Sequence, residues 1–127
     1  MRRRKLRGDP RALGRWGERR CERFLRGKGL RTLARNFTCP AGEIDLVMVD
    51  RDSSIVFVEV RTRASETFAS AEQSVTYSKK SRLSRAVRTF LAAHEIEDRP
   101  CRIDVVTIVL PPKGSPRITH YPNAFAP

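Results

Sequence analysis

The sequence predicts an α/β fold in which a mixed β-sheet, an antiparallel meander plus a parallel strand, is flanked by helices. Apolar residues recur at helical spacing over residues 10–27 and again from about residue 76. Between them lie runs rich in Val, Ile and Phe, separated by turn-forming clusters such as "CPAG" and "DRDSS". The later run "CRIDVVTIVL" is continuously apolar, which is typical of a strand covered on both faces. With 127 residues, the chain is expected to form a single domain over residues 1–127.

The first helix has clear start and stop signals. Asp9 followed by Pro10 predicts its beginning, because the carboxylate can accept from free amides while proline tolerates the first helical position. Gly27 and Gly29 are expected to end it. Glu18 lies at the margin of the apolar stripe, from which a side chain can reach a neighbouring sheet. The opposite side carries a basic ridge of arginines: Arg15, Arg19, Arg23 and Arg26.

The remaining elements follow from the same patterns. The expected elements, in order, are strands 30–38, 43–49 and 55–63 as the meander, a loop or short helix over 66–74, a helix from about 76, a strand at 101–110 and a short edge strand at 117–125. The helix from residue 76 is the second basic helix, with Lys80, Arg82, Arg85 and Arg88 mostly off its apolar face.

The charge of the chain points to a polyanionic partner. Lys and Arg number 26 against 14 Asp and Glu, a net charge of +12, and residues 1–35 alone hold 14 basic and 3 acidic residues. Such a field attracts phosphate polyanions and makes association salt-dependent. The alternative is that an arginine-rich composition only coats a solvated face. Residues 1–9 are expected to form a basic, flexible arm.

The composition also argues against other classes of protein. No run approaches the roughly 18 apolar residues of a membrane span, and the charged start is not followed by a signal-peptide core, so we expect a cytoplasmic protein without a membrane partner. Cys21, Cys39 and Cys101 match neither a disulfide framework nor paired zinc ligands. His94 and His120 are isolated in the sequence, which disfavours a histidine metal cluster.

The hairpin of residues 43–63 raises a question of geometry. If Asp50 pairs with Ser54, the two residue numbers of every other cross-strand pair add up to the same total. Asp45 then lies opposite Glu59, and residue 43 lies opposite residue 61. Directly opposed residues share a face, and a one-residue change of register would separate them. The sequence therefore predicts two adjacent carboxylates in otherwise apolar strands.

Two adjacent carboxylates need a cation between them, because like charges this close repel and raise a pKa. An oxygen-lined site for Mg²⁺ or Mn²⁺ answers that need. The alternative is a structural ion pair, in which Arg61 neutralises Glu43 or Asp45. From geometry alone both readings stay open.

Several motifs together resemble a known family. "GEIDLV", "VFVEVRTR", "LGRWGERRCERFL", "SVTYSKKSRL", "RIDVV" and the terminal "NAF" resemble the YraN family of uncharacterised bacterial proteins, which are similar to archaeal Holliday-junction resolvases. The resemblance runs from about residue 12 to residue 125. Its sharpest element is the D-(spacer)-E-x-K pattern of restriction-endonuclease-like nucleases, here Asp45, Glu59 and, in the place of the lysine, Arg61.

The resemblance implies a restriction-endonuclease-like fold and a metal-dependent nuclease site. It implies that Asp45 and Glu59 bind the metal, that the carbonyl of Val60 completes the coordination, and that Glu18 supplies a further ligand. Lys79 falls where the family places a basic residue, and Lys80 follows it. The resemblance also implies Gln73 and Tyr77 as a Q-x-x-x-Y motif, and a homodimer. Apart from the resemblance, the basic ridge makes Arg15, Arg19 and Arg23 the expected nucleic-acid contacts, and Glu43, opposite Arg61 in the expected register, a candidate accessory residue.

Arg61 departs from the pattern of the nuclease superfamily. Arginine stays protonated at any working pH, so it cannot be a general base, but its planar fork can clamp a phosphate or stabilise developing charge. Three readings remain: a metal-dependent endonuclease acting on DNA, branched or otherwise structured; a nucleic-acid-binding module without turnover; and an accessory protein that docks an acidic partner. No Walker-type phosphate loop or G-x-G-x-x-G is present in the sequence.

Overall fold

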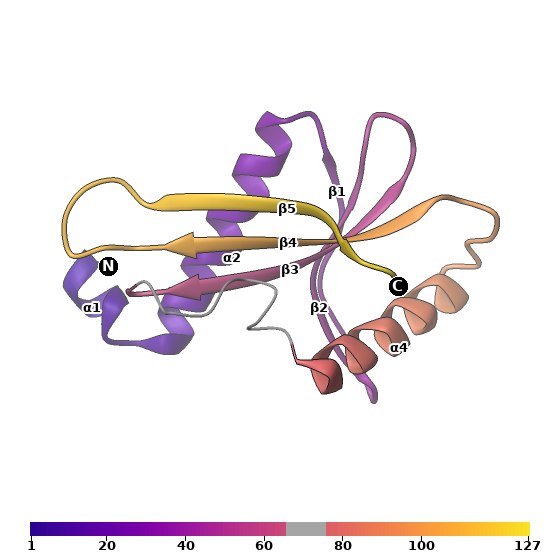
Figure 1. Ribbon diagram of the computed structural model, residues 1–127, viewed down its shortest axis with the longest axis horizontal. Helices are drawn as coiled ribbons and strands as arrows, with labels where there is room; N and C mark the ends of the chain where they lie inside the picture. The colour runs from indigo at the N-terminus through magenta and orange to yellow at the C-terminus, as the bar shows by residue number, and fades with distance from the viewer. Residues whose placement is uncertain (66–75) are drawn as a thin grey trace.

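A computed structural model describes residues 1–65 and 76–127. The elements, in chain order, are α1 (Arg3–Arg7), α2 (Pro10–Gly27), β1 (Arg31–Cys39), β2 (Gly42–Val49), β3 (Ile55–Arg63), α4 (Tyr77–Ala93), β4 (Cys101–Val109) and β5 (Arg117–Phe125) (Figure 1). The predicted boundaries agree with these to within two residues, whereas the expected loop or short helix over 66–74 lies outside the described residues.

The strands form one five-stranded mixed sheet in the order β1-β2-β3-β4-β5. β3 and β4 are parallel, and the other neighbouring pairs are antiparallel. A parallel pair requires a crossover connection, and α4 lies in that connection. The predicted α/β class with a mixed sheet is confirmed, and the arrangement is consistent with a restriction-endonuclease-like fold.

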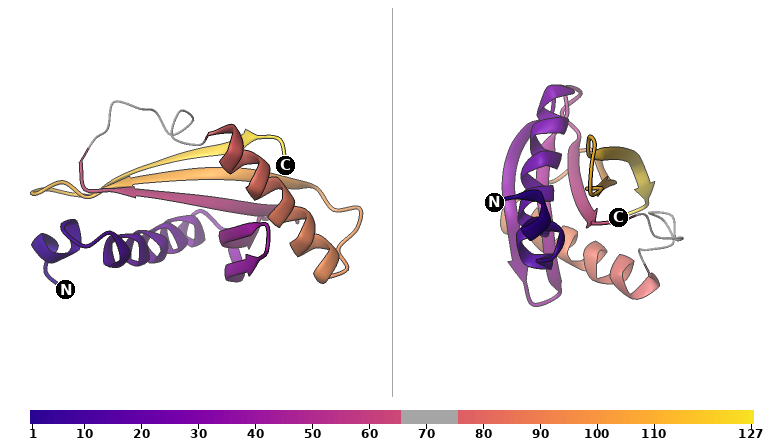
Figure 2. Two further views of the ribbon diagram at one scale, coloured as in Figure 1. Left: turned by 90° about the horizontal axis from the view of Figure 1, so that it is seen from below. Right: turned by 90° about the vertical axis from the view of Figure 1, so that its left-hand side faces the viewer.

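The two long helices cover opposite faces of the sheet (Figures 1 and 2). Cys21 and Leu25 of α2 pack with Val58 of β3 and the side chains around it. Leu83 and Phe90 of α4 pack in a second apolar cluster on the other face. β3 lies between the two clusters, so its side chains alternate between the α2 face and the α4 face.

Helix α2 begins and approaches the sheet as its sequence dictates. Asp9 caps it, and its Oδ1 accepts from the amides of Arg11 at 3.1 Å and Ala12 at 3.2 Å. The helix ends at Gly27. About two turns from its start, the helix comes so close to β3 that a Cβ added to Gly17 would lie 2.8 Å from the Cβ of Thr62. This close approach fixes the height of the neighbouring Glu18 above the sheet.

Residues 1–9, expected to form a flexible arm, contain the short helix α1. Its arginines bond to backbone carbonyls at the end of the sheet. Arg3 donates to Gly114 at 2.8 Å, and Arg7 donates to Ala64 at 2.8 Å and to Leu110 at 3.1 Å. In the structure this segment is therefore ordered against the sheet, and its arginines satisfy protein carbonyls as well as adding to the positive field.

Asp104 of β4 is fully buried and fully hydrogen-bonded. It accepts from Nε2 of His120 at 2.7 Å, from the amide of Asn123 at 2.9 Å and from Nε of Arg102 at 3.0 Å. Burial alone would raise the pKa of Asp104, but these hydrogen bonds outweigh it and hold the pKa below its usual value. Arg102, two residues before it on β4, also forms an ion pair with Asp104.

We expect Asp104→Asn to lower the free energy of unfolding by about 1–3 kcal/mol at pH 7. The NH₂ group of asparagine would face N–H donors that now bond to a carboxylate oxygen, so at least one of these hydrogen bonds is lost. A depressed pKa stabilises the fold above the ordinary value of 3.8, and this contribution disappears as the pH falls through the lowered pKa. The difference in urea unfolding between wild type and variant should therefore begin to narrow below about pH 4 and vanish below the lowered pKa. The exposed Asp98→Asn is the matched control, and a constant gap at all pH values would contradict the prediction.

Candidate functional site

The β2–β3 hairpin adopts the predicted register. The amide of Asp50 donates to the carbonyl of Ser54 at 2.9 Å. The following pairs, from Val49 with Ile55 to Leu46 with Val58, continue in the register that this pair sets. The ladder ends there, so neither the expected pair of Asp45 with Glu59 nor that of residues 43 and 61 is part of it. The strands thus bring the two acidic positions to the point where regular pairing stops.

Asp45 lies at a break in β2. Ile44 packs in the cluster under α4, whereas Leu46 packs in the cluster under α2, although regular alternation would place both on one face. Opposite the break, Asn36 of β1 has a φ of 50°, a left-handed conformation that asparagine tolerates better than most residues. The break turns the Asp45 carboxylate toward β3, where Oδ2 accepts from the amide of Val60 at 2.8 Å.

Asp45 and Glu59 form a coupled pair of carboxyls. Burial raises the pKa of Asp45, opposed by the hydrogen bond from Val60, and the charge of Glu43 raises it further. Burial and the nearby charge of Asp45 also raise the pKa of Glu59, while Arg61 and then Lys79 lower it. A hydrogen bond between the two carboxyl groups adds to the coupling. The pair is therefore held at a net electrostatic cost.

Glu18 faces the same pair from α2. Partial burial, followed by the charges of Asp45 and Glu43, raises the pKa of Glu18 to about 7. Glu18 and Asp45 line the same cavity between α2 and β2, which has a volume of about 140 Å³. Glu18 and Asp45 therefore share one cavity, whereas Glu59, the third carboxylate that the resemblance implied as a ligand, lines a different cavity.

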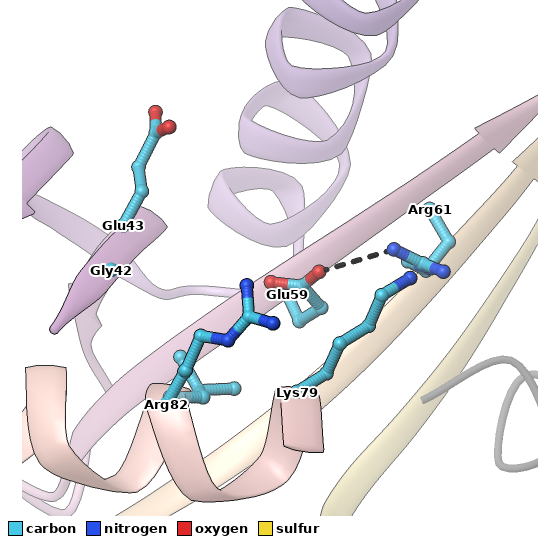
Figure 3. Close-up of a pocket in the computed structure, with 7 residues that line it drawn as sticks. Gly42, Glu43, Glu59, Arg61, Lys79 and Arg82 are labelled. Atoms are coloured by element: carbon cyan, nitrogen blue, oxygen red, sulfur yellow. Dashed lines mark ion pairs between the residues drawn. The ribbon is translucent and has the colours of Figure 1, made fainter. Parts of the chain in front are cut away.

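A second cavity, of about 180 Å³, lies on the α4 side of the pair, lined by Gly42, Glu43, Glu59, Arg61, Lys79, Arg82 and Leu83. Figure 3 shows Lys79 and Arg82 pointing from α4 toward Glu59 and Arg61, whereas the Glu43 side chain points away from them. Nη1 of Arg61 lies 3.5 Å from Oε1 of Glu59. Arg61 therefore pairs with Glu59, and its charge also opposes the raised pKa of Asp45.

The other predicted contact residues divide into two groups. Arg15 and Arg19 are exposed and line the cavity that contains Glu18. Arg23 is exposed but lies one turn further along α2, and Nζ of Lys80 lies 5.2 Å from the ring centroid of Phe125. Of the Q-x-x-x-Y motif, Tyr77 is 88% exposed at the start of α4, and Gln73 lies outside the described residues.

Arg82 is the site residue that the sequence reasoning did not single out. It lines the cavity beside Glu59, one helical turn after Lys79. Residues three apart on a helix share a face, so the spacing from Lys79 was the signal that could have found it.

The donor set fits a hard divalent cation. Among residues 1–65 and 76–127, no three Asp, Glu, His or Cys side chains converge closely enough to hold a metal ion as they stand. Mg²⁺, however, is commonly held by one or two carboxylates together with waters and substrate phosphates. Two partly buried, repelling carboxyls match that donor set. The N–H and C=O of one strand residue point to the same side, so the carbonyl of Val60 also faces β2.

The fold and the site together define an α/β protein with an acidic pair at a strand break, set between cationic residues of two helices. No helix in the described part of the chain combines the length and apolar character needed to cross a membrane.

Residues 17–108 match the model of the uncharacterised protein family UPF0102, and the chain belongs to this family, the YraN family that the motifs resemble. A UPF0102 protein of Beutenbergia cavernae is 42% identical over 109 residues, which cover 86% of this chain and 92% of that protein. One from Pelotomaculum thermopropionicum is 42% identical over 114 residues, covering 89% of this chain and 94% of that protein. A third, from Geotalea daltonii, is 38% identical and covers 92% and 91%, respectively.

Proposed function

We propose that the protein is a metal-dependent endonuclease that hydrolyses phosphodiester bonds in DNA, including branched or otherwise structured DNA. One observation carries the proposal: Asp45 and Glu59 are held together at an electrostatic cost, directly beside the cationic Arg61 and Lys79. A merely structural pair of acids gains nothing from this repulsion. A site that binds a cation and a phosphate relieves it, because the cation and the acids attract each other and the basic residues attract the phosphate.

Each residue has a role that follows from its position. Asp45 and Glu59 would hold Mg²⁺ or Mn²⁺, with Glu18 and the carbonyl of Val60 nearby. The bound ion would activate water and neutralise charge on the scissile phosphate. Arg61, which stays protonated, would orient that phosphate through its planar fork and stabilise the charge that develops on it. Arg61 does not remove a proton in this scheme.

The second candidate function is a nucleic-acid-binding module without turnover, and the observation that favours it is Arg61 itself. Arg61 lies 3.5 Å from Glu59, where it offsets part of the acidic charge that would otherwise attract a metal. Such a module would bind DNA with a steep dependence on salt and release no metal-dependent product.

The two functions separate in one assay. We expect wild-type protein to nick or cut supercoiled plasmid and synthetic four-way junctions in Mg²⁺ or Mn²⁺, with no product in EDTA. Gel electrophoresis of both substrates over a range of salt concentrations measures the product. DNA retention without product in either metal would contradict the endonuclease and support the binding module.

A further inference from the structure

The cavities beside the acidic pair form one trough. The cavity on the α4 side shares Glu43 with an open cavity of about 440 Å³ at the start of α2. That cavity shares Arg15, Glu18 and Asn36 with the cavity that contains Asp45. Glu43 and Asp45 of β2 therefore line cavities that adjoin one another through shared residues on both sides of the acidic pair.

The trough has a basic bank on each side of the acids. On the α4 bank, Lys79 and Arg82 line the cavity together with Arg61. On the α2 bank, Arg11 and Arg15 line the open cavity, and both are exposed. The two banks belong to different helices on opposite faces of the sheet, so one phosphate cannot occupy both.

The positive residues are not distributed evenly along these helices. Lys79 and Arg82 on α4 lie toward the trough, whereas Arg85 and Arg88 are exposed and do not line it. On α2, Arg11 and Arg15 line the open cavity, whereas Arg26 is exposed in the last turn. Both helices thus carry natural controls, in which the same residue type lies off the trough.

We infer that one continuous nucleic-acid strand crosses the trough, with one phosphate on the Arg82 bank, another on the Arg15 bank, and the intervening phosphate at the acidic pair. The inference rests on the proposed function for the role of the acidic pair. Among residues 1–65 and 76–127, the cavities on both sides of that pair are open to solvent, so the strand needs no terminus. Internal positions of a strand are the expected substrate, and Arg82 and Arg15 are its positioning residues.

The number of counter-ions released on binding tests this path. We use a fluorescein-labelled single-stranded DNA in Ca²⁺, which takes the same oxygen ligands, and measure Kd as a function of salt. Each phosphate contact on single-stranded DNA contributes about 0.7 to the slope of log Kd against log salt concentration. Arg82→Ala and Arg15→Ala should each remove about that amount, and the double variant about twice as much. The controls Arg88→Ala and Arg26→Ala should leave the slope nearly unchanged.

Three results would overturn the inference. If Arg82→Ala behaves as Arg88→Ala does, the α4 bank is excluded. If the double variant loses no more than one single variant, the banks do not hold the same strand. If circular single-stranded DNA competes more than about tenfold less well than a linear strand of equal length, a terminus is required.

The same measurements distinguish this inference from the proposed function. If the slopes change as expected but no metal-dependent product forms in Mg²⁺ or Mn²⁺, the strand path is supported and the proposed endonuclease activity is contradicted. If product forms but Arg82→Ala and Arg15→Ala bind like their controls, the activity stands and the path is wrong.

Discussion

Asp45→Asn is expected to abolish metal-dependent cleavage while leaving the protein as stable as wild type or more stable. The amide oxygen of asparagine can still accept from Val60, so the contact between β2 and β3 survives. The substitution removes one of two repelling charges, and a carboxyl whose pKa is raised by burial destabilises the folded state when it is ionised. Loss of the anionic ligand removes several kcal/mol of charge stabilisation, so we expect cleavage to fall at least 100-fold, or about 3 kcal/mol.

The opposite signs of the two effects make this prediction specific. Cleavage of plasmid in Mg²⁺ measures the first effect, and the midpoint of urea unfolding measures the second. Asp98→Asn carries the same change of charge at an exposed position and should alter neither. Equal cleavage by Asp45→Asn and wild type would remove Asp45 from the chemistry, and a large loss of stability would show that Asp45 is mainly a structural residue.

Gly17→Ala is expected to lower the free energy of unfolding by about 1–3 kcal/mol, which is typical of overpacking in a close-packed interior. The added methyl group would lie 2.8 Å from both Cβ and Cγ2 of Thr62. Thr62 is β-branched and has few rotamers to which it can move, so α2 itself must shift away from β3. Glu18 follows Gly17 directly, and any such shift also moves it relative to Asp45.

Gly14→Ala supplies the matched control on the same helix. A Cβ at Gly14 meets nothing within 4 Å, so alanine should raise stability by about 0.5–1 kcal/mol through helix propensity alone. Urea unfolding of the two variants should therefore move in opposite directions. If Gly17→Ala is as stable as Gly14→Ala, the close approach of helix and sheet does not constrain the fold.

Local rules were sufficient to predict most of the fold. Asp9 and Pro10 mark the start of α2 because capping is decided by adjacent residues. The register of the hairpin follows from the turn between Asp50 and Ser54, because a turn fixes every pair in the ladder beyond it. Both features depend on interactions across a few residues, which sequence patterns report directly.

Features that depend on three-dimensional packing were less predictable. The break of β2 at Asp45 places Ile44 in the cluster under α4 and Leu46 in the cluster under α2, two faces that regular alternation would not give them. No alternation rule reports such a change of face, and the only local signal was Asn36, a residue that tolerates a positive φ. The docking of Arg3 and Arg7 onto distant carbonyls was likewise invisible, because their partners lie far along the chain.

The parallel pairing of β3 with β4 has a consequence for the order of folding. β2 meets β3 across a short turn, whereas β4 meets β3 only after the chain has passed through α4. Closing a longer loop costs more entropy, so the hairpin is expected to form before the crossover closes. Asp45 and Glu59 are then brought together early, before the basic residues of α4 pack beside them. Their repulsion therefore raises the free energy of the transition state for folding. Acidification or added salt should therefore speed the formation of the native state.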